Sequence, residues 1–259
     1  MLENTFIHIQ GIGPKTEKKL WEQGILTWRH FLNCKRIIFS KDRDVFICKE
    51  LEMSFDHRND IAFFKDRLSA AHVWRLYDDF KDKAVYLDIE TSGRYQGMDE
   101  ITVIGLYDGH EINTFIDGFN LNDFEIAIDR YDLVVTFNGG NFDLPFIERR
   151  FPCITLPPVH IDLRFFLRGL GYKGGLKSIE KQFGITRTPE IDGMNGYDAV
   201  LLWKAYQWGD TAALDRLIKY NTADIVNLKT IMESGYDQMK NRLLKNWSGQ
   251  SAHLDKRNI

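Results

Sequence analysis

Apolar residues recur at three- and four-residue steps along most of the first 80 residues. This spacing predicts helices over residues 14–23, 43–53 and 59–80. From residue 83 the pattern changes to short apolar runs, which predict strands over 83–90, 100–108 and 111–116. We therefore expect a small, mainly helical first domain, a second domain of another type and a polar C-terminal tail. Their predicted ranges are 1–80, 81–240 and 241–259.

The second domain continues with alternating helices and strands. Strands are predicted over 132–137 and 158–163. Helices are predicted over 120–131, 142–150, 175–183, 196–208 and 210–236. Three successive strands followed by such an alternation are typical of an α/β fold, a mixed sheet flanked by helices.

The predicted strand over 83–90 carries two acids, Asp88 and Glu90, among apolar residues. Side chains two residues apart on a strand project from the same face, so both carboxylates meet at one point. An ionised carboxylate removed from water costs several kcal/mol unless something compensates it. The strand therefore either ends in solvent or needs a cation beside the two acids.

Two later segments carry further candidate groups. The strand over 132–137 leads into Asn138 and two glycines, and Asp143 follows at the start of a predicted helix. Asp143 fits a helix cap, and it also fits an acid at the carboxyl end of a strand, where open α/β folds place their sites. Tyr220 and Asp224 are four residues apart on a late helix and share a face, either as a buried hydrogen-bonded pair or as part of a site.

Taken together, these acids indicate a metal site. Four carboxylates from a strand, a helix start and a late helix repel one another strongly unless cations lie between them. Oxygen ligands without His or Cys favour Mg²⁺ or Mn²⁺ over zinc. Two such ions about 3.5–4 Å apart stabilise both the attacking and the leaving oxygen in phosphodiester displacement. The sequence therefore predicts two divalent cations, Mg²⁺ or Mn²⁺, with Tyr220 orienting the attacking water or helping to deprotonate it.

Three motifs occur in order: Asp88-x-Glu90, the segment NGGNFD and Tyr220-xxx-Asp224. They resemble the three exonuclease motifs of the DnaQ-like DEDD superfamily. Tyr220, four residues before the last Asp, is similar to the tyrosine that marks the DEDDy branch of this superfamily. This branch includes the proofreading domains of family B DNA polymerases. The segments YLDIETSG, VVTFNGGNFDLPF, HIDLR and GLKSIEKQFGI are similar to stand-alone microbial proteins of the YprB-type, RNase H-like group. The resemblance covers roughly residues 83–235.

The resemblance implies an RNase H-type mixed five-stranded sheet with helices on both faces. It implies cleavage of one nucleotide at a time from a 3′ end, with release of nucleoside 5′-monophosphates. In this scheme Asp88 bridges both metals, and Glu90 and Asp224 complete the site of the ion that activates water. Asp143 holds the second ion, and Tyr220 positions the nucleophile.

Residues near the acids are candidates for substrate binding. The segment 162–181 places basic residues, including Arg168, around two glycine turns, which fits phosphate binding and equally a solvated helix face. Phe142 fits stacking on a terminal base or burial in the core. Asp162 is expected either to cap a helix or to support the metal ligands without contacting an ion itself. The predicted substrate-binding residues are Thr91, Asn138, Phe142, Arg164, Lys173 and Lys177.

Residues 5–27 resemble a helix-hairpin-helix motif, because two glycines flank Ile12 and Pro14 follows at a predicted first helical position. The resemblance implies that the glycines let backbone amides approach a DNA phosphate, while lysines add nonspecific attraction. The predicted DNA-contacting residues are Gly11, Gly13, Lys15 and Lys18. Glu17 stands where the family often has a small residue, and an ordinary glycine turn before a helix is the alternative.

The composition is that of an ordinary globular chain: 259 residues, 44% hydrophobic and 27% charged, with a formal net charge of −3. The first 75 residues are slightly basic and the rest is acidic, which permits a nucleic-acid partner if cations occupy the acidic part. Three widely spaced cysteines without a CxxC pair favour a reduced, cytoplasmic protein without a thiolate metal site. We expect no membrane span and no signal peptide.

The sequence therefore predicts a cytoplasmic, metal-dependent 3′–5′ exonuclease that acts on single-stranded nucleic-acid ends. The preference for DNA over RNA depends on the N-terminal motif. One alternative is an RNA-processing 3′–5′ exonuclease with the same chemistry. Another is a catalytically silent nucleic-acid-binding adaptor on a nuclease fold, although all five site positions are filled here.

Overall fold

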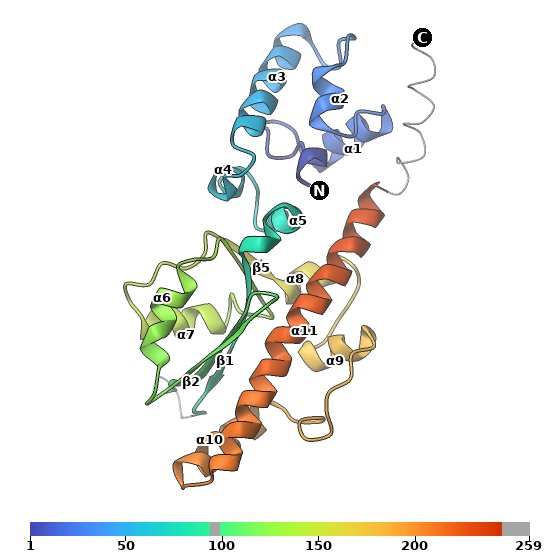
Figure 1. Cartoon of the computed structure of the whole chain (residues 1–259). Coiled ribbons are helices and arrows are strands. Elements are labelled where there is room, and N and C mark those ends of the chain that lie inside the picture. The colour runs from blue at the N-terminus through green and yellow to red at the C-terminus, as the bar shows by residue number, and fades with distance from the viewer. Residues whose placement is uncertain (94–98, 245–259) are drawn as a thin grey trace. The chain divides into compact units, whose positions relative to one another are not determined.

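The structure is a computed structural model of the chain, and it describes residues 1–93 and 99–244 (Figure 1). The chain divides into two compact units, Met1–Lys81 together with the chain from Tyr236 on, and Asp82–Gly235. The end of the last helix, which the sequence places in the second domain, thus groups with the first unit. Of the predicted tail, residues 241–244 are helical and residues 245–259 lie outside the described residues. The organisation into independent domains stays a prediction.

The first unit is mainly helical. Pro14 begins α1, and the side chains of Thr27, Ser40 and Asp60 each cap the next helix by accepting a backbone N–H. The helices predicted over 14–23 and 43–53 correspond to α1 and α3. The elements are η1 (Leu2–Asn4), α1 (Pro14–Glu22), α2 (Trp28–Leu32), α3 (Lys41–Asp56), α4 (Ile61–Lys65), η2 (Val73–Leu76) and α5 (Tyr77–Phe80), with η3 (Lys81–Lys83) at the boundary.

The single helix predicted over 59–80 is wrong. α4 ends at Lys65, and the chain turns before it continues as η2 and α5. In this turn the hydroxyl group of Ser69 lies 2.8 Å from Nδ1 of His72, and the Ser69 carbonyl accepts the His72 N–H. A serine side chain that bonds nearby groups competes with the helical pattern, so the apolar periodicity spans several short helices.

The second unit is built on a five-stranded sheet with the strand order β3-β2-β1-β4-β5. β2 runs antiparallel to β1 and β3, whereas β4 runs parallel to β1 and β5, so the predicted mixed sheet is confirmed. The strands are β1 (Ala84–Thr91), β2 (Ile101–Tyr107), β3 (Ile112–Ile116), β4 (Leu133–Thr136) and β5 (Val159–Asp162). The helices are η4 (Leu121–Asp123), α6 (Phe124–Ile128), α7 (Asp143–Arg150), α8 (Leu163–Arg168), α9 (Leu176–Gln182), α10 (Gly196–Gln207) and α11 (Thr211–Leu244).

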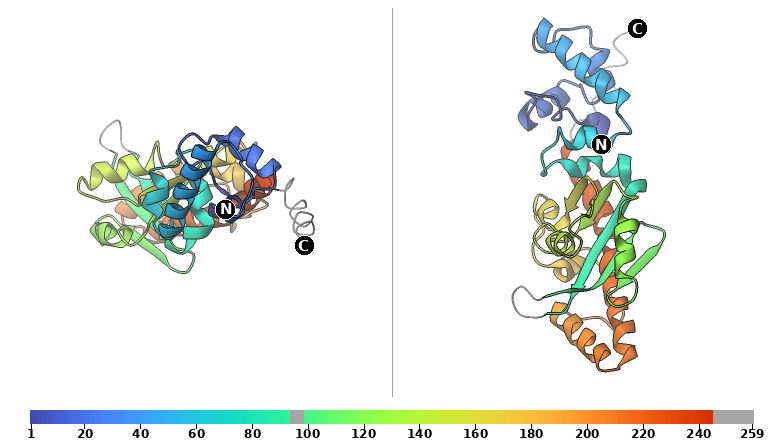
Figure 2. Two further views of the ribbon diagram at one scale, coloured as in Figure 1. Left: turned by 90° about the horizontal axis from the view of Figure 1, so that it is seen from above. Right: turned by 90° about the vertical axis from the view of Figure 1, so that its left-hand side faces the viewer.

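Helices cover both faces of this sheet (Figure 2). On one face, Phe124 of α6 and Ile147 of α7 belong to the same buried cluster as Leu87 of β1. On the other face, Trp203 of α10 packs in a cluster with Val103 of β2 and with residues of α11. Successive side chains of β1 therefore face different helices.

Gly105 on β2 permits the close approach of α11 to the sheet. A Cβ atom at this position would lie 2.1 Å from Oδ1 of Asn221 and 3.1 Å from Cδ1 of Ile225. Gly105 is also the register partner of Asp88 on β1. The missing side chain therefore brings α11 next to the acidic strand.

The variant Gly105→Ala should be less stable, because an added methyl group in a packed interface costs about 1–3 kcal/mol. Differential scanning fluorimetry should show a fall of about 3 °C or more in the thermal midpoint. In an Asn221→Ala background the same substitution should cost much less, since the obstructing amide is gone. An equal cost in both backgrounds contradicts this account of the packing.

The three cysteines, Cys34, Cys48 and Cys153, are free thiols. Within residues 1–93 and 99–244, no helix is both long enough and apolar enough to cross a membrane. The cytoplasmic location stays a prediction.

Candidate active site

Asp88 and Glu90 lie on the face of the sheet that α10 and α11 cover. In the register of β1 and β2, Glu90 pairs with Val103, and residues directly opposite each other share a face. Because Val103 packs against α10 and α11, both acids project toward these helices. Glu90 is only 7% exposed, so its carboxylate is almost entirely removed from water.

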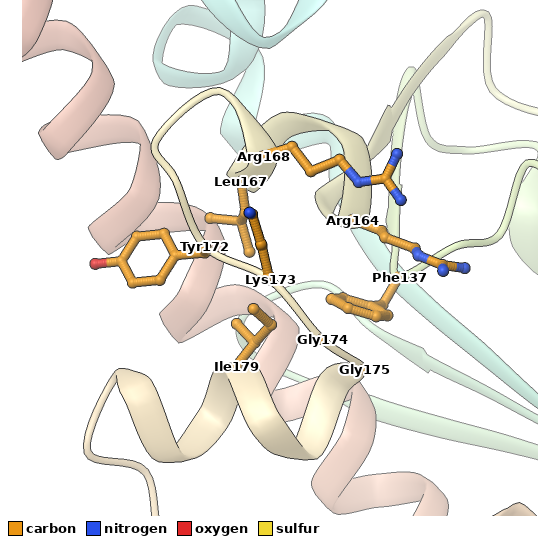
Figure 3. Close-up of a pocket in the computed structure, with 9 residues that line it drawn as sticks. All are labelled: Phe137, Arg164, Leu167, Arg168, Tyr172, Lys173, Gly174, Gly175 and Ile179. Atoms are coloured by element: carbon orange, nitrogen blue, oxygen red, sulfur yellow. The ribbon is translucent and has the colours of Figure 1, made fainter.

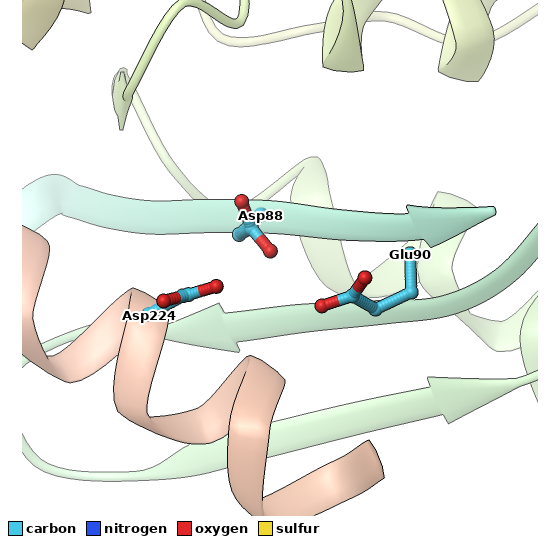
Figure 4. Close-up of side chains that lie close together, drawn as sticks. All are labelled: Asp88, Glu90 and Asp224. Carbon is cyan, nitrogen blue, oxygen red and sulfur yellow. The ribbon is translucent and has the colours of Figure 1, made fainter. Parts of the chain in front are cut away.

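α11 supplies the third acid. Asp224 is buried, and Tyr220 lies one turn before it on the same helix. One carboxylate oxygen from each of Asp88, Glu90 and Asp224 lies within 4.8 Å of the other two. Figure 4 shows the three carboxyl groups in one space between β1 and α11. The structure therefore brings together three of the four predicted metal ligands, which we call the acid cluster.

Asp143, the fourth predicted ligand, lies beside the acid cluster. It begins α7, as predicted, and it is buried. Its Oδ1 accepts the backbone N–H of Ile89 at 3.1 Å, between the two acids of β1. After burial and the charge of Asp224, the charge of Asp143 is the next cause that raises the pKa of Asp88, so the two carboxyl groups are close. Asp143 is thus fixed to the strand rather than grouped with the other three carboxylates.

The loop that positions Asp143 is held by Asp162 at the end of β5. Asn138 adopts φ +67°, a left-handed conformation that Asn tolerates better than most residues. Asp162 accepts the N–H groups of Asn138 at 2.8 Å and Gly140 at 3.3 Å, and it caps α8 through the N–H of Arg164. Both readings of Asp162 are therefore correct, since it caps a helix and supports the loop behind the site.

Burial dominates the electrostatics of the acids. It raises the pKa values of Asp88 and Glu90 well above their ordinary range, and repulsion from Asp224 is the next cause for each. Burial also raises the pKa of Asp143 to about 7. Oε1 of Glu90 is buried and has no hydrogen-bond partner among the described residues. An unpartnered buried carboxylate oxygen among further acids is an arrangement that a cation stabilises.

Tyr220 is buried at the edge of the acid cluster, and its hydroxyl group accepts a hydrogen bond from Nζ of Lys177. The same ammonium group lies 4.3 Å from the centre of the Tyr220 ring. Burial, followed by the charge of Asp224, raises the pKa of the Tyr220 hydroxyl, so it stays protonated at neutral pH. Lys177 also opposes the rise in the pKa values of Asp88 and Glu90, since its positive charge favours their ionised forms.

The groups that hold the acid cluster in place were not predicted from the sequence. Nδ2 of Asn221 donates to the carbonyl oxygen of Asp88 at 3.2 Å and to its Oδ2 at 3.0 Å. A signal was available, since Asn221 lies three residues before Asp224 and therefore on the same helical face.

Arg187 is the second missed residue, and it is buried in a loop. Its guanidinium group forms an ion pair with Asp224 and donates to both carboxylate oxygens of Glu180, at 2.8 and 2.5 Å. Nδ2 of Asn227 also donates to Glu180, at 2.9 Å. The side chains of Arg187, Glu180 and Asp224 are 4%, 3% and 6% exposed, so this three-residue ionic network is almost dry.

Five of the six predicted substrate-binding residues line a pocket, and they divide between two pockets. Thr91, Phe142 and Lys177 line a pocket of about 320 Å³ next to the acid cluster, which we call the acid pocket. Arg164 and Lys173 line a second pocket instead. Asn138 lines neither of these pockets, and its side-chain oxygen accepts a hydrogen bond from Arg164 at 2.7 Å.

The N-terminal motif has one regular helix. Gly11 has φ +79° and Gly13 precedes α1, while the described residues before α1 contain only the short η1. Glu17, which departs from the family pattern, is buried and pairs with Arg75 at 2.8 Å. It also accepts the N–H of Phe6 at 2.7 Å, so it serves the core of this unit. Lys15 and Lys18 are exposed, and DNA binding by this motif stays a prediction.

The raised pKa of Asp143 predicts a pH-dependent effect of the variant Asp143→Asn in chelator. The folded protein keeps a proton on Asp143 that the unfolded chain releases, so this stabilisation is lost as the pH rises from about 4 to about 7. Asparagine at position 143 cannot ionise, so the variant does not lose this stabilisation. The difference in thermal midpoint, variant minus wild type, should therefore increase by about 3 °C or more between pH 4 and pH 7.

The comparison has to be made between the two proteins, since other groups titrate in the same range. Burial lowers the pKa of His8 to about 3, which stabilises the wild type and the variant equally as the pH rises. A saturating concentration of Mg²⁺ or Mn²⁺ at pH 7.5 should reverse the sign of the difference, because an ion favours the ionised carboxylate. If the difference in thermal midpoint between the two proteins in chelator does not change with pH, the raised pKa of Asp143 is contradicted.

A mixed sheet of this strand order, with acids on its first strand and helices on both faces, is an RNase H-like α/β fold. A sequence model of the RNase_H superfamily matches residues 85–236, which is more than half of the chain. The chain therefore belongs to the RNase H superfamily.

A curated relative is the DNA polymerase 1 of Aeropyrum pernix, which is 34% identical over 109 residues. This match covers 37% of the present chain and 11% of the polymerase, so the chain spans only a small part of its relative's length.

Several solved structures are similar at low sequence identity. The family B DNA polymerase from Pyrobaculum calidifontis has a TM-score of 0.45 and 15% identity over 60% of this chain and 24% of its own. Escherichia coli RNase D, described as an exoribonuclease involved in structured RNA processing, has a TM-score of 0.41 and 16% identity. The match covers 70% of this chain and 48% of RNase D. Brucella melitensis NrnC with bound Mg²⁺ has a TM-score of 0.41 and 18% identity, and the match covers 70% of this chain and 89% of NrnC.

Proposed function

We propose that this protein is a divalent-metal-dependent 3′–5′ exonuclease that hydrolyses phosphodiester bonds at single-stranded nucleic-acid ends. The observation that carries the proposal is the acid cluster, in which three carboxylate groups lie within 4.8 Å of one another beside an open pocket. Membership of the RNase H superfamily supports a nuclease. A relative that is a DNA polymerase supports a nucleic-acid strand as the substrate.

The donor set suits Mg²⁺ or Mn²⁺. All four acids offer only oxygen atoms, and Oε1 of Glu90 has no protein partner in the part of the chain that the structure describes. Asp88, Glu90 and Asp224 would hold one ion, and Asp88 with Asp143 would hold a second. When bound, such ions lower the pKa of a water molecule and stabilise negative charge on the phosphate.

The other residues of the acid pocket would position the reactants. The protonated hydroxyl group of Tyr220 would orient the attacking water, and the hydrogen bond from Lys177 keeps that hydroxyl oriented. The Lys177 ammonium group would attract the scissile phosphate. Phe142 is 39% exposed and lines the pocket, so its ring is available to stack on the terminal base.

The choice between DNA and RNA rests on the N-terminal motif, and the test is direct. Matched DNA and RNA strands with a 5′ label are digested with Mg²⁺ or with Mn²⁺, and the products are separated by length. We expect a ladder that shortens from the 3′ end, with DNA degraded faster than RNA. Faster RNA digestion would support the RNA-processing exonuclease, and binding without cleavage in either ion would support the silent adaptor.

A further inference from the structure

A second pocket lies next to the acid pocket, between the end of β4, α8 and the loop before α9 (Figure 3). Its volume is about 650 Å³, within the range of sites for small ligands. All of its charged lining residues are cations, namely Arg164, Arg168 and Lys173. We call it the basic pocket.

In the part of the chain that the structure describes, the side chains of Arg164 and Arg168 interact with polar or aromatic groups and not with a paired carboxylate. The guanidinium group of Arg164 donates to the side-chain oxygen of Asn138, and that of Arg168 lies 5.4 Å from the centre of the Phe165 ring. Over residues 1–93 and 99–244, none of the three cations forms an ion pair with a carboxylate. In a protein with a net charge of −3, three unpaired cations around one hollow create a local positive potential that an anion would stabilise.

The arrangement of the cations fits a phosphate group on a flexible chain. Arg164 and Arg168 are four residues apart on α8, and in Figure 3 both side chains extend in the same direction from the helix. Arginine binds phosphate oxygens through two parallel hydrogen bonds, whereas Lys173 adds a point charge. Gly174 and Gly175 complete the wall next to Lys173, and a Cβ atom at Gly175 would meet nothing within 4 Å, so the backbone there is open to a ligand.

The basic pocket adjoins the acid pocket. Phe137 lines both, and the chain passes directly from Gly175 of the basic pocket to Leu176 and Lys177 of the acid pocket. Phe137 therefore lies where the two pockets meet, and Figure 3 shows its ring among the residues of the basic pocket. An aromatic ring at this place suits stacking by a nucleobase of any identity.

We propose that the basic pocket binds the backbone phosphate of the nucleotides that precede the 3′-terminal nucleotide, with a base stacked on Phe137. This proposal rests on the proposed function, since it places the 3′ end of the strand in the acid pocket. The acid pocket then performs hydrolysis, and the basic pocket determines how strongly a strand is preferred over a single nucleotide ester.

The experiment compares a strand with a substrate that has nothing upstream. The proteins are the wild type, Arg168→Gln and Lys173→Gln, with Lys181→Gln as the matched control, because Lys181 is an exposed lysine of α9 outside both pockets. Binding of a fluorescent single-stranded oligonucleotide is measured by anisotropy in chelator at several salt concentrations. Hydrolysis of the p-nitrophenyl ester of thymidine 5′-monophosphate is measured with Mn²⁺.

Arg168→Gln and Lys173→Gln should each weaken strand binding about tenfold and reduce the slope of log K against log salt by about 0.7. Both should leave kcat/KM for the nucleotide ester unchanged, and Lys181→Gln should alter neither. Unchanged strand binding, or an equal loss on the strand and on the ester, would overturn the proposal. If no protein hydrolyses the ester or the strand, the proposed function fails, whereas the binding measured in chelator still decides the role of the basic pocket.

Discussion

Asp88→Asn should abolish hydrolysis of single-stranded DNA. A carboxylate oxygen of Asp88 lies within 4.8 Å of oxygens of both Glu90 and Asp224, and its carboxylate would contact both ions, so its loss removes several kcal/mol of transition-state stabilisation. This corresponds to about a 1,000-fold or larger fall in kcat. The measurement is release of mononucleotides from a 3′-labelled strand with Mg²⁺ or Mn²⁺.

The same variant should be more stable than the wild type in chelator at pH 8. Asparagine keeps an oxygen that accepts the hydrogen bond of Asn221, but it removes a negative charge that lies near three other buried acids. The thermal midpoint should therefore rise while activity is lost. Asp129→Asn, at an exposed position in the same unit, is the control and should change neither property. An Asp88→Asn protein that is folded and keeps a tenth of the activity would contradict the assignment.

Arg187→Gln should cause the largest loss of stability among single substitutions near the site. Arg187 pairs with Glu180 and Asp224 in a nearly dry environment, so its removal leaves two buried carboxylates without their cation. Breaking a buried ion pair in this way costs about 3–5 kcal/mol. Thermal unfolding in chelator should show the midpoint falling by about 10 °C.

Three comparisons separate the ionic network from a general packing defect. Glu180→Gln in the Arg187→Gln background should recover part of the loss, because it removes one of the unpaired charges. Saturating Mn²⁺ should recover another part, since an ion held by the acid cluster would neutralise Asp224, whereas Glu180 does not belong to this cluster. Lys219→Gln, which breaks an exposed ion pair with Glu190, should have almost no effect. If Arg187→Gln and Lys219→Gln unfold at the same temperature, the network does not stabilise the site.

The acids of the site could be predicted because each lies in a segment with a simple period. Asp88 and Glu90 share a face through the two-residue period of a strand, whereas the helices that cover this face are known only from the packing of Val103. Asp143 could be placed at a helix start because the two glycines mark the preceding turn. The resemblance to known exonucleases supplied the five-stranded sheet, which periodicity alone does not fix.

The supporting groups could not be predicted, because they depend on contacts between distant segments. Arg187 lies in a loop with no periodicity and reaches Asp224 from 37 residues away. The break in the helix predicted over 59–80 depends on a local bond of Ser69 that the apolar pattern does not report. The division of the basic residues between two pockets likewise requires the path of the loop before α9.

The metal dependence of 3′-end release tests the central claim most directly. A single-stranded DNA with a 3′-terminal label is incubated with protein freed of metal by chelation, and Mg²⁺ or Mn²⁺ is then added in increasing concentration. We predict no release in chelator and a saturable release with added ion, in which the label appears as a mononucleotide from the earliest time. Release that is independent of divalent ions, or label that first appears in longer fragments, would contradict a metal-dependent 3′–5′ exonuclease.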